Sequence, residues 1–178
     1  RGSGYAYAND STLGGDGGAT VNLPISDTLA FRGSYDYRSD PGFIDYKYLV
    51  REVGVSNPDP DFTDPADVSA NLKQHKGAND VQTRSGRAAL RWQPTDAVDA
   101  TLSYYFQLQD VGGRNSSAHG STIDVGKYVS TQRVTEPNDR ENQLVALEIT
   151  ADLGFAELTS ATGVSQYQEN GRRDQTDL

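Results

Sequence analysis

A strict alternation of apolar and polar residues recurs along most of this 178-residue chain. Successive side chains of a β-strand point to opposite faces of the sheet, so a period of two predicts strands with one apolar and one polar face. The clearest segment is 98–110, and its length suits a tilted strand of about 9 to 11 residues that crosses an apolar layer. Its alternating apolar positions are Val98, Ala100, Leu102, Tyr104, Phe106 and Leu108.

The same alternation places the other strands. We expect strands near 17–25, 29–38, 82–93, 98–110, 141–152 and 156–168, and a further first strand near Tyr5 and Tyr7. The sequence therefore predicts an all-β fold, an antiparallel meander of about seven strands within a single unit that spans residues 1–178.

Short and long connections alternate between these strands. Tight turns rich in Ser, Asp, Pro and Gly are expected at 24–28, 92–96 and 152–155. The connections near 39–80 and 112–140 are polar and far longer than those of a compact domain. Barrels of the outer membrane have short turns on one side and long loops on the other, so we predict part of a transmembrane β-barrel with two long extracellular loops. We expect these loops to capture a ligand, and the alternative is that they are merely disordered.

Composition excludes several classes of protein. Mean hydropathy is -0.67, and no apolar run approaches the roughly 18 residues of a spanning helix, which excludes a helical membrane protein. A barrel tolerates such a polar average because every second strand residue faces a wet lumen. The net charge of -9 opposes nucleic-acid binding, and the absence of cysteine excludes disulfides and cysteine-based metal sites. Because the chain starts at Arg1 without a signal-peptide pattern, we expect it to be excised from a longer protein.

The positions of the aromatic residues favour the membrane barrel over a soluble β-sandwich or lectin-like jelly roll, which would also show alternating strands. Trp92 lies on the apolar face just before a tight turn. Tyr35, Tyr37, Tyr104 and Phe106 approach the long-loop ends, as residues of an interfacial aromatic girdle do. Charges on the polar faces suit either solvent or a lumen and do not discriminate between the two folds.

Three strings and one strand pair resemble the early barrel strands of TonB-dependent outer-membrane receptors. The strings are Asp40–Asp45, Trp92–Asp96 and Asp152–Ser160, and the strand pair runs from Gly17 to Ala30. The resemblance covers about residues 14–167. It implies a large barrel of 22 strands, an N-terminal plug, and uptake of a scarce ligand, namely an iron-siderophore, a vitamin or an oligosaccharide, powered by the TonB complex. It also implies residence in the outer membrane of a Gram-negative bacterium, in contact with its lipid.

Parts of that family's pattern are missing from this sequence. We find no plug domain, no energy-coupling box and no aromatic C-terminal strand end. About seven strands do not close a barrel of this class, so we predict a curved open sheet whose edges need neighbouring strands. The alternative functions are a binding or adhesion module, in the form of a passive outer-membrane barrel or a soluble β-sandwich lectin.

Candidate site residues come from the expected loops and the upper ends of the strands. A receptor contacts its ligand through a few well-positioned polar and aromatic side chains. On this basis we select Tyr46, Tyr48, Arg51, Asp110, Arg114 and Tyr128 as candidate ligand contacts. No catalytic motif is present, so we expect neither an enzyme nor a cofactor. The acidic run at 57–67 offers Asp59, Asp61 and Asp64 as a weak Ca²⁺ candidate, and the plainer reading is a solvated, proline-stiffened loop.

Overall fold

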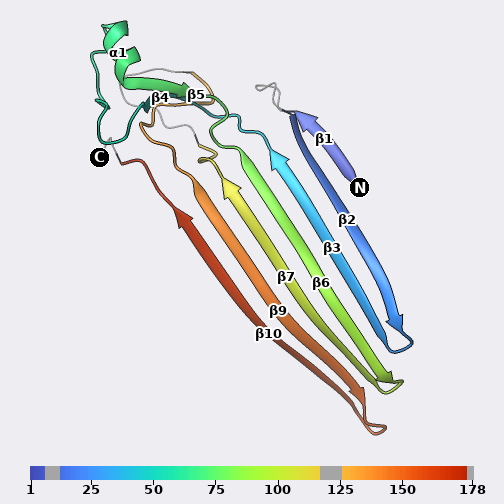
Figure 1. Ribbon diagram of the computed structural model, residues 1–178. Helices are drawn as coiled ribbons and strands as arrows, with labels where there is room; N and C mark the ends of the chain where they lie inside the picture. Colours follow the sequence, from blue (N-terminus) through green and yellow to red (C-terminus); the bar gives the residue numbers. More distant parts are fainter. Residues whose placement is uncertain (7–12, 117–125, 176–178) are drawn as a thin grey trace.

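Seven antiparallel strands, six of them long, form the main sheet in the computed structural model, which describes residues 1–6, 13–116 and 126–175 (Figure 1). The spatial order is β1-β2-β3-β6-β7-β9-β10, and all the pairings are antiparallel. The strands are β1 (Gly2–Ala6), β2 (Leu13–Ser26), β3 (Leu29–Asp40), β6 (Val81–Thr95), β7 (Val98–Val111), β9 (Asn138–Asp152) and β10 (Glu157–Gly171). The predicted all-β fold and its seven-stranded meander are confirmed, and most strands run a few residues beyond the expected ranges. Tyr7 lies outside the described residues.

The described sheet is open. β1 and β10 lie at its two edges, and no strand pairing between them closes a barrel within the described residues. Three short turns, after β2, β6 and β9, lie at one end of the sheet, as Figure 1 shows. No helix in this part of the chain has the length and hydrophobicity of a membrane span.

The described residues of the two long connections carry secondary structure, in contrast to the alternative that these loops are merely disordered. They form a second, three-stranded sheet of order β5-β4-β8 at the end of the main sheet opposite the short turns (Figure 1). Its elements are β4 (Asp45–Val50), α1 (Pro65–Asn71), β5 (Leu72–His75) and β8 (Val129–Ser130). We call the described residues of 41–80 and 112–137 the cap. β4 pairs with β8 in parallel, so the cap joins both excursions into one body.

A small apolar core holds the cap together. Ile44, Tyr46, Leu49 and Ala78 are 0–3% exposed, and Phe43 and Tyr128 pack against them. The amide oxygen of Asn79, itself buried, accepts the backbone N–H groups of Phe43 and Ile44 at 2.7 Å each. Gly42 lies directly on the backbone of Gly77, where a Cβ would sit 1.8 Å from the carbonyl oxygen. Only glycine permits this approach, and it brings the two ends of the first excursion together.

The strand register sorts the side chains of the main sheet onto two faces. On the apolar face, Leu102 of β7 lies in register between Leu90 of β6 and Leu147 of β9. On the opposite, polar face, one cross-strand row of polar residues runs through all seven strands: Ser3, Asp16, Arg38, Thr83, Gln109, Arg140 and Glu169. We call this the polar row.

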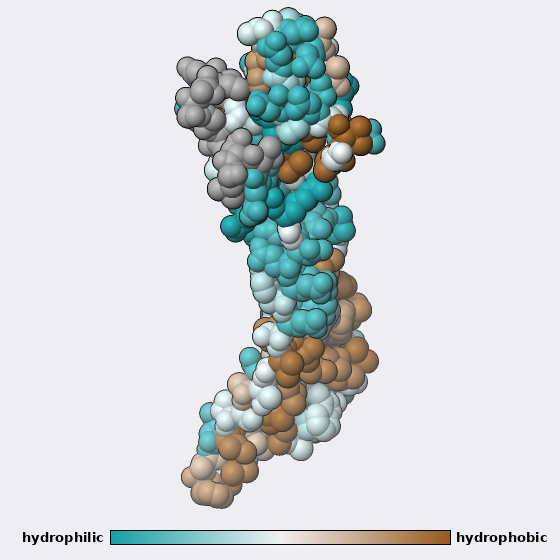
Figure 2. Space-filling model, turned by 90° about the vertical axis from the view of Figure 1, so that its left-hand side faces the viewer, coloured by the Kyte–Doolittle hydropathy of each residue, from teal (hydrophilic) through white to brown (hydrophobic). Residues whose placement is uncertain are grey.

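The apolar side chains occupy only part of the length of the strands. Figure 2 shows hydrophobic residues in the lower part of the sheet, near the short turns, and hydrophilic residues above them toward the cap. The aromatic residues expected at the upper limit of this region do lie together. The Tyr35 and Phe106 ring centroids are 6.4 Å apart, and those of Tyr104 and Phe106 are 6.2 Å apart. Trp92 lies at the lower end of β6, next to the turn.

Candidate functional site

Two clefts of the described chain lie on the cap and at its junction with the upper end of the polar face. The six candidate residues do not converge on one site there. Tyr46 and Tyr128 belong to the cap core, Tyr48 and Arg51 line a cleft on the cap, Arg114 lines a second cleft, and Asp110 lies on another face.

Tyr46 is a core residue and offers no surface to a ligand. It is 0% exposed, and its hydroxyl, which lies under Gly113, has no hydrogen-bond partner among the described residues. Burial raises the pKa of Tyr46, and the negative charge of Glu136 raises it further. The nearby backbone and guanidinium of Arg114 offset part of that rise. Tyr46 was selected as a ligand contact within an expected loop, and the structure places it in the buried core of the cap.

Tyr128 also has a structural role. Its ring meets Phe43 edge to face, with centroids 5.8 Å apart, and the Lys127 ammonium lies 4.7 Å from its centroid. Its backbone has a φ of 62°, in the left-handed region that non-glycine residues rarely adopt. This conformation turns the chain into β8, and the Tyr128 carbonyl then accepts the Asp45 N–H at 2.9 Å.

Tyr48 and Arg51 line a cleft of about 440 Å³ between β4, α1 and β5. Lys47 and Lys73 also line it, and Phe62 meets Tyr48 edge to face at 5.3 Å. The Arg51 Nε donates to the Ser69 carbonyl at 2.6 Å, which holds that side chain across the helix. The cleft therefore combines three cations with an aromatic wall.

Arg133, which the sequence analysis did not select, orders this part of the cap. Its guanidinium carbon lies 5.7 Å from the Tyr48 ring centroid and 5.6 Å from that of Phe62. Its Nε donates to the Pro58 carbonyl, and one terminal nitrogen donates to the Thr131 carbonyl at 2.6 Å. It is only 7% exposed. Cation–π contacts and carbonyl acceptors therefore compensate for the lost hydration of this charge.

A second cleft, of about 690 Å³, lies where the cap meets β9 and β10. We call it the arginine cleft, because its lining contains Arg114, Arg140, Arg172 and Arg173, together with Glu136 and Glu169. Arg114 pairs with the buried Glu136 at 3.3 Å, and Arg140 pairs with Glu169 at 3.3 Å. The sequence singled out Arg114 but missed the other three arginines, which lie far from it along the chain.

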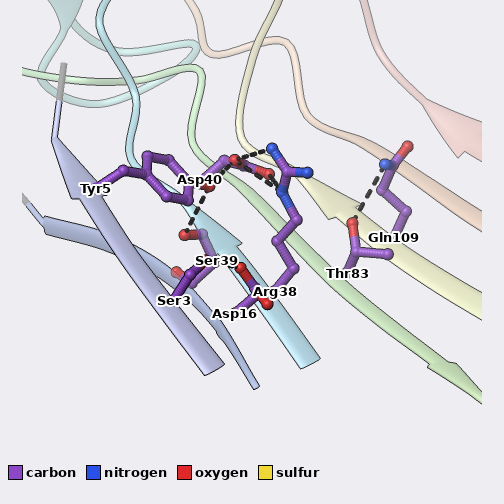
Figure 3. A network of polar contacts seen from close by, with 8 residues as sticks. All are labelled: Ser3, Tyr5, Asp16, Arg38, Ser39, Asp40, Thr83 and Gln109. Carbon is purple, nitrogen blue, oxygen red and sulfur yellow. Dashed lines mark hydrogen bonds and ion pairs between the residues drawn. The ribbon is translucent and has the colours of Figure 1, made fainter. Parts of the chain in front are cut away.

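The polar row supplies the rest of the upper polar face. Gln109 donates to the Thr83 hydroxyl at 3.3 Å, and Arg140 donates to the Gln109 oxygen at 3.3 Å. At the other edge, Arg38 donates to both carboxylate oxygens of Asp40, at 2.7 and 2.8 Å (Figure 3). The Tyr5 hydroxyl also donates to Asp40, which joins β1 to the top of β3.

Asp110 does not lie on the polar face. It follows Phe106 and Leu108 at intervals of two residues on β7, so it shares their face, and it pairs with Arg84 at 3.2 Å. Asp110 was selected as a ligand contact at the end of the expected strand 98–110, and the period of two in that strand puts it on the face of Phe106 and Leu108 rather than on the polar face.

The three acidic residues of the Ca²⁺ hypothesis do not converge, and the described residues contain no group of three carboxylate or imidazole side chains that could hold a metal ion. Asp64 caps α1 and accepts the Ala66 N–H at 2.9 Å. Asp61 accepts the Thr63 N–H at 2.8 Å and the Thr63 hydroxyl at 2.6 Å, and these bonds lower the pKa of Asp61. The Asp59 N–H donates to the Asn57 side chain at 3.0 Å. Two of these carboxylates are thus used in local turns.

Comparison with known proteins gives no family: no family model, no curated protein and no solved structure matches this chain.

Proposed function

We propose that this chain forms part of the wall of an outer-membrane receptor barrel of the TonB-dependent type, with its apolar face against lipid and its cap and polar face toward an imported ligand. One observation carries the proposal: in the part of the chain that the structure describes, no element covers the apolar face of the long sheet, and its apolar side chains form a belt next to the short turns.

The belt is exposed to a degree that water does not favour. Leu23, Leu102 and Trp92 are each 48–51% exposed, although they lie within a regular sheet. Contiguous apolar surface of this extent marks a site of contact with another protein or with a membrane. In a soluble sandwich a second sheet would cover this face, whereas the second sheet of the described chain lies at the strand ends, in the cap.

The dimensions of the belt fit a bilayer. On β7 it extends from Val98 to Leu108, about 33 Å along the strand at 3.3 Å per residue. A strand tilted by about 40° gives this length a height of about 25 Å, which is the height of the apolar band of outer-membrane barrels.

The edges of the belt also run diagonally across the sheet. On β3 the upper edge of the belt is at Tyr37, which is in cross-strand register with Gln168 on β10. On β10 the highest large apolar residue of the apolar face is Val164, four residues below Gln168 (164 to 168). This shift is about 13 Å over four strand spacings of about 4.8 Å each, which corresponds to a tilt of about 35°. Strands of outer-membrane barrels tilt by about 35–45°. The short turns descend in the same direction in Figure 1.

The receptor part of the proposal draws on the cap and the turn strings. Two cation-rich clefts, one of which also has aromatic rings in its lining, lie at the end of the sheet away from the short turns, where a receptor would meet its ligand. The turn sequences Trp92–Asp96 and Asp152–Ser160 resemble those of TonB-dependent receptors, and this resemblance favours that class over a passive barrel. Among the described residues the outer edges of β1 and β10 have no partner strand, and further strands of the same barrel would pair with them, because lipid does not satisfy free backbone groups.

Trp92, the only tryptophan of these 178 residues, reports on the membrane part of the proposal once any tryptophan elsewhere in the intact protein is replaced with phenylalanine. We expect its fluorescence to be quenched by lipids brominated in the acyl chain when the intact protein is reconstituted into vesicles. A Trp92→Phe, Tyr105→Trp double variant moves the reporter to the polar face, where brominated lipid should quench it weakly. An intact protein that stays in the aqueous phase without detergent, with Trp92 open to iodide but not to brominated lipid, would instead be a soluble β-sandwich.

Growth or uptake assays test the transport part. Deleting the cap residues 45–75 from the intact protein should abolish energised uptake while leaving the protein in the outer membrane. Uptake that is unchanged by this deletion, or by loss of the TonB complex, would contradict a role in energised import.

A further inference from the structure

We infer that the arginine cleft is a preformed binding site for a multivalent anion that carries carboxylate or phosphate groups. The inference deepens the proposed function, on which it rests for the direction of transport, by naming the chemical class of the ligand.

The charge inside the cleft is positive, against the trend of the chain. Four arginines and two glutamates line it, whereas the whole chain has a net charge of -9. The carboxylates are already engaged. Glu136, whose side chain is 1% exposed, accepts from Arg114, from the Gln132 amide and from the Asp174 backbone N–H. Glu169 accepts from Arg140, Asn138 and Tyr167. The arginines therefore dominate the field that a ligand meets.

Three of the arginines are held in position from behind. Arg114 uses its Nε for Glu136, and Arg140 uses Nε and one terminal nitrogen for Glu169 and Gln109. Arg172 uses Nε and one terminal nitrogen for the carbonyl and hydroxyl of Thr135, at 2.9 and 2.7 Å. Each guanidinium has five N–H donors, so each keeps at least three for a ligand. Fixing the side chains in advance reduces the entropy lost on binding.

Arg173 has a different status. It lines the cleft but forms no ion pair or hydrogen bond with the residues that the structure describes. A guanidinium binds carboxylate and phosphate through paired, parallel N–H donors, so an unpaired arginine beside three anchored ones selects for an anion. A volume of about 690 Å³ admits a small organic molecule with several such groups.

The location of the cleft separates this site from the lipid-facing surface. Arg140 and Glu169 belong to the polar row, and Arg114 comes from the cap, so the cleft opens on the junction of the polar face and the cap. Arg84, on the opposite face, offers a matched control. It is 43% exposed and pairs with Asp110 at 3.2 Å, as Arg140 is 42% exposed and pairs with Glu169 at 3.3 Å.

Titration calorimetry on the intact protein in neutral detergent tests the inference without requiring a membrane or transport. The probes are inorganic pyrophosphate and citrate, with neutral maltose as the control ligand. We expect pyrophosphate, citrate or both to bind, more weakly at higher salt, and maltose to give no heat at this site. The anion that binds more tightly tells whether phosphate or carboxylate is the preferred group.

The Arg140→Gln and Arg173→Gln variants should each weaken binding roughly tenfold, while Arg84→Gln leaves it unchanged. Arg173→Gln is the cleanest variant, since it leaves no carboxylate unpaired, and Arg114→Lys, which keeps the positive charge beside Glu136, should retain part of the affinity. Absence of binding by both anions, or equal binding by Arg173→Gln, Arg140→Gln and the unmodified protein, would overturn the inference. Because Trp92 quenching is measured separately, failure of the anion site and failure of the membrane proposal are distinguishable.

Discussion

Replacing Leu102 with arginine separates a lipid-facing sheet from a water-exposed one. Leu102 lies on the central strand β7, in register between Leu90 and Leu147, and is 48% exposed in the absence of lipid. Burying a whole leucine side chain contributes about 1.5–3 kcal/mol, so lipid covering the exposed half contributes about 1 kcal/mol.

An arginine at this position adds a second and larger cost. Leu102 is four residues from Val98 at the lower edge of the belt and six from Leu108 at its upper edge, near the middle of the bilayer. Arginine on the lipid face of a barrel at that depth costs about 2–4 kcal/mol. We therefore expect Leu102→Arg to lower the free energy of unfolding by about 3–5 kcal/mol in vesicles.

Urea-induced unfolding of the intact protein in vesicles measures this difference, with Thr101→Arg as the control. Thr101 is the next residue along β7, on the polar face, in register with Arg91 and Glu148. An arginine there should change stability by less than about 1 kcal/mol. If Leu102→Arg and Thr101→Arg proved equal within about 0.5 kcal/mol, the apolar face would not contact lipid.

Three further predictions concern the cap. Arg133→Ala should destabilise the cap by about 3 kcal/mol, because two cation–π contacts and two hydrogen bonds to carbonyl groups are lost. Limited proteolysis should then cut within residues 45–75 while the main sheet persists. The control variant Arg51→Ala loses one exposed hydrogen bond and should have a much smaller effect. Tyr46→Phe should stabilise the cap by about 1 kcal/mol by removing an unsatisfied hydroxyl. Because burial raises the pKa of Tyr46 in the folded cap, the stability linked to its neutral hydroxyl is fully present below the unfolded pKa of about 10 and is lost as pH rises through the folded pKa. Hydrogen exchange should therefore show that the unmodified cap loses more stability above pH 10 than the Tyr46→Phe cap does. Asp64→Ala should cost about 1 kcal/mol by removing the N-cap of α1, seen as faster amide exchange in residues 65–71, and an unchanged rate would contradict the capping role.

The strands of the main sheet were readable from the sequence because their signal is local. Fourteen residues of β7 carry the whole alternation, and the hairpin turns follow directly from the adjacent Asp, Pro and Gly residues. Strand length and the two faces therefore need no knowledge of the neighbours, and the register follows from the short turns.

The structure of the cap could not be predicted from the sequence, because its strands are held by contacts with residues far away along the chain. β4, β5 and β8 have six, four and two residues, too few for a period to stand out. Asn79 anchors Phe43 from 36 residues away, and β4 pairs with β8 more than eighty residues later in the chain. Tyr46 and Tyr48 lie two residues apart on β4. Contacts with distant segments of the chain decide that Tyr46 becomes a core residue whereas Tyr48 lines a cleft.

By itself, then, the sequence determined which side chains form the apolar face, since alternation fixes which residues of a strand share a face wherever that strand pairs. Only the tertiary structure decided where charge collects. Arg114, Arg140 and the neighbouring Arg172 and Arg173 lie far apart along the chain, and folding gathers them because the cap meets the upper ends of β9 and β10. Electrostatic fields depend on distance in space, so a binding cleft of this kind comes into existence only when the distant segments meet.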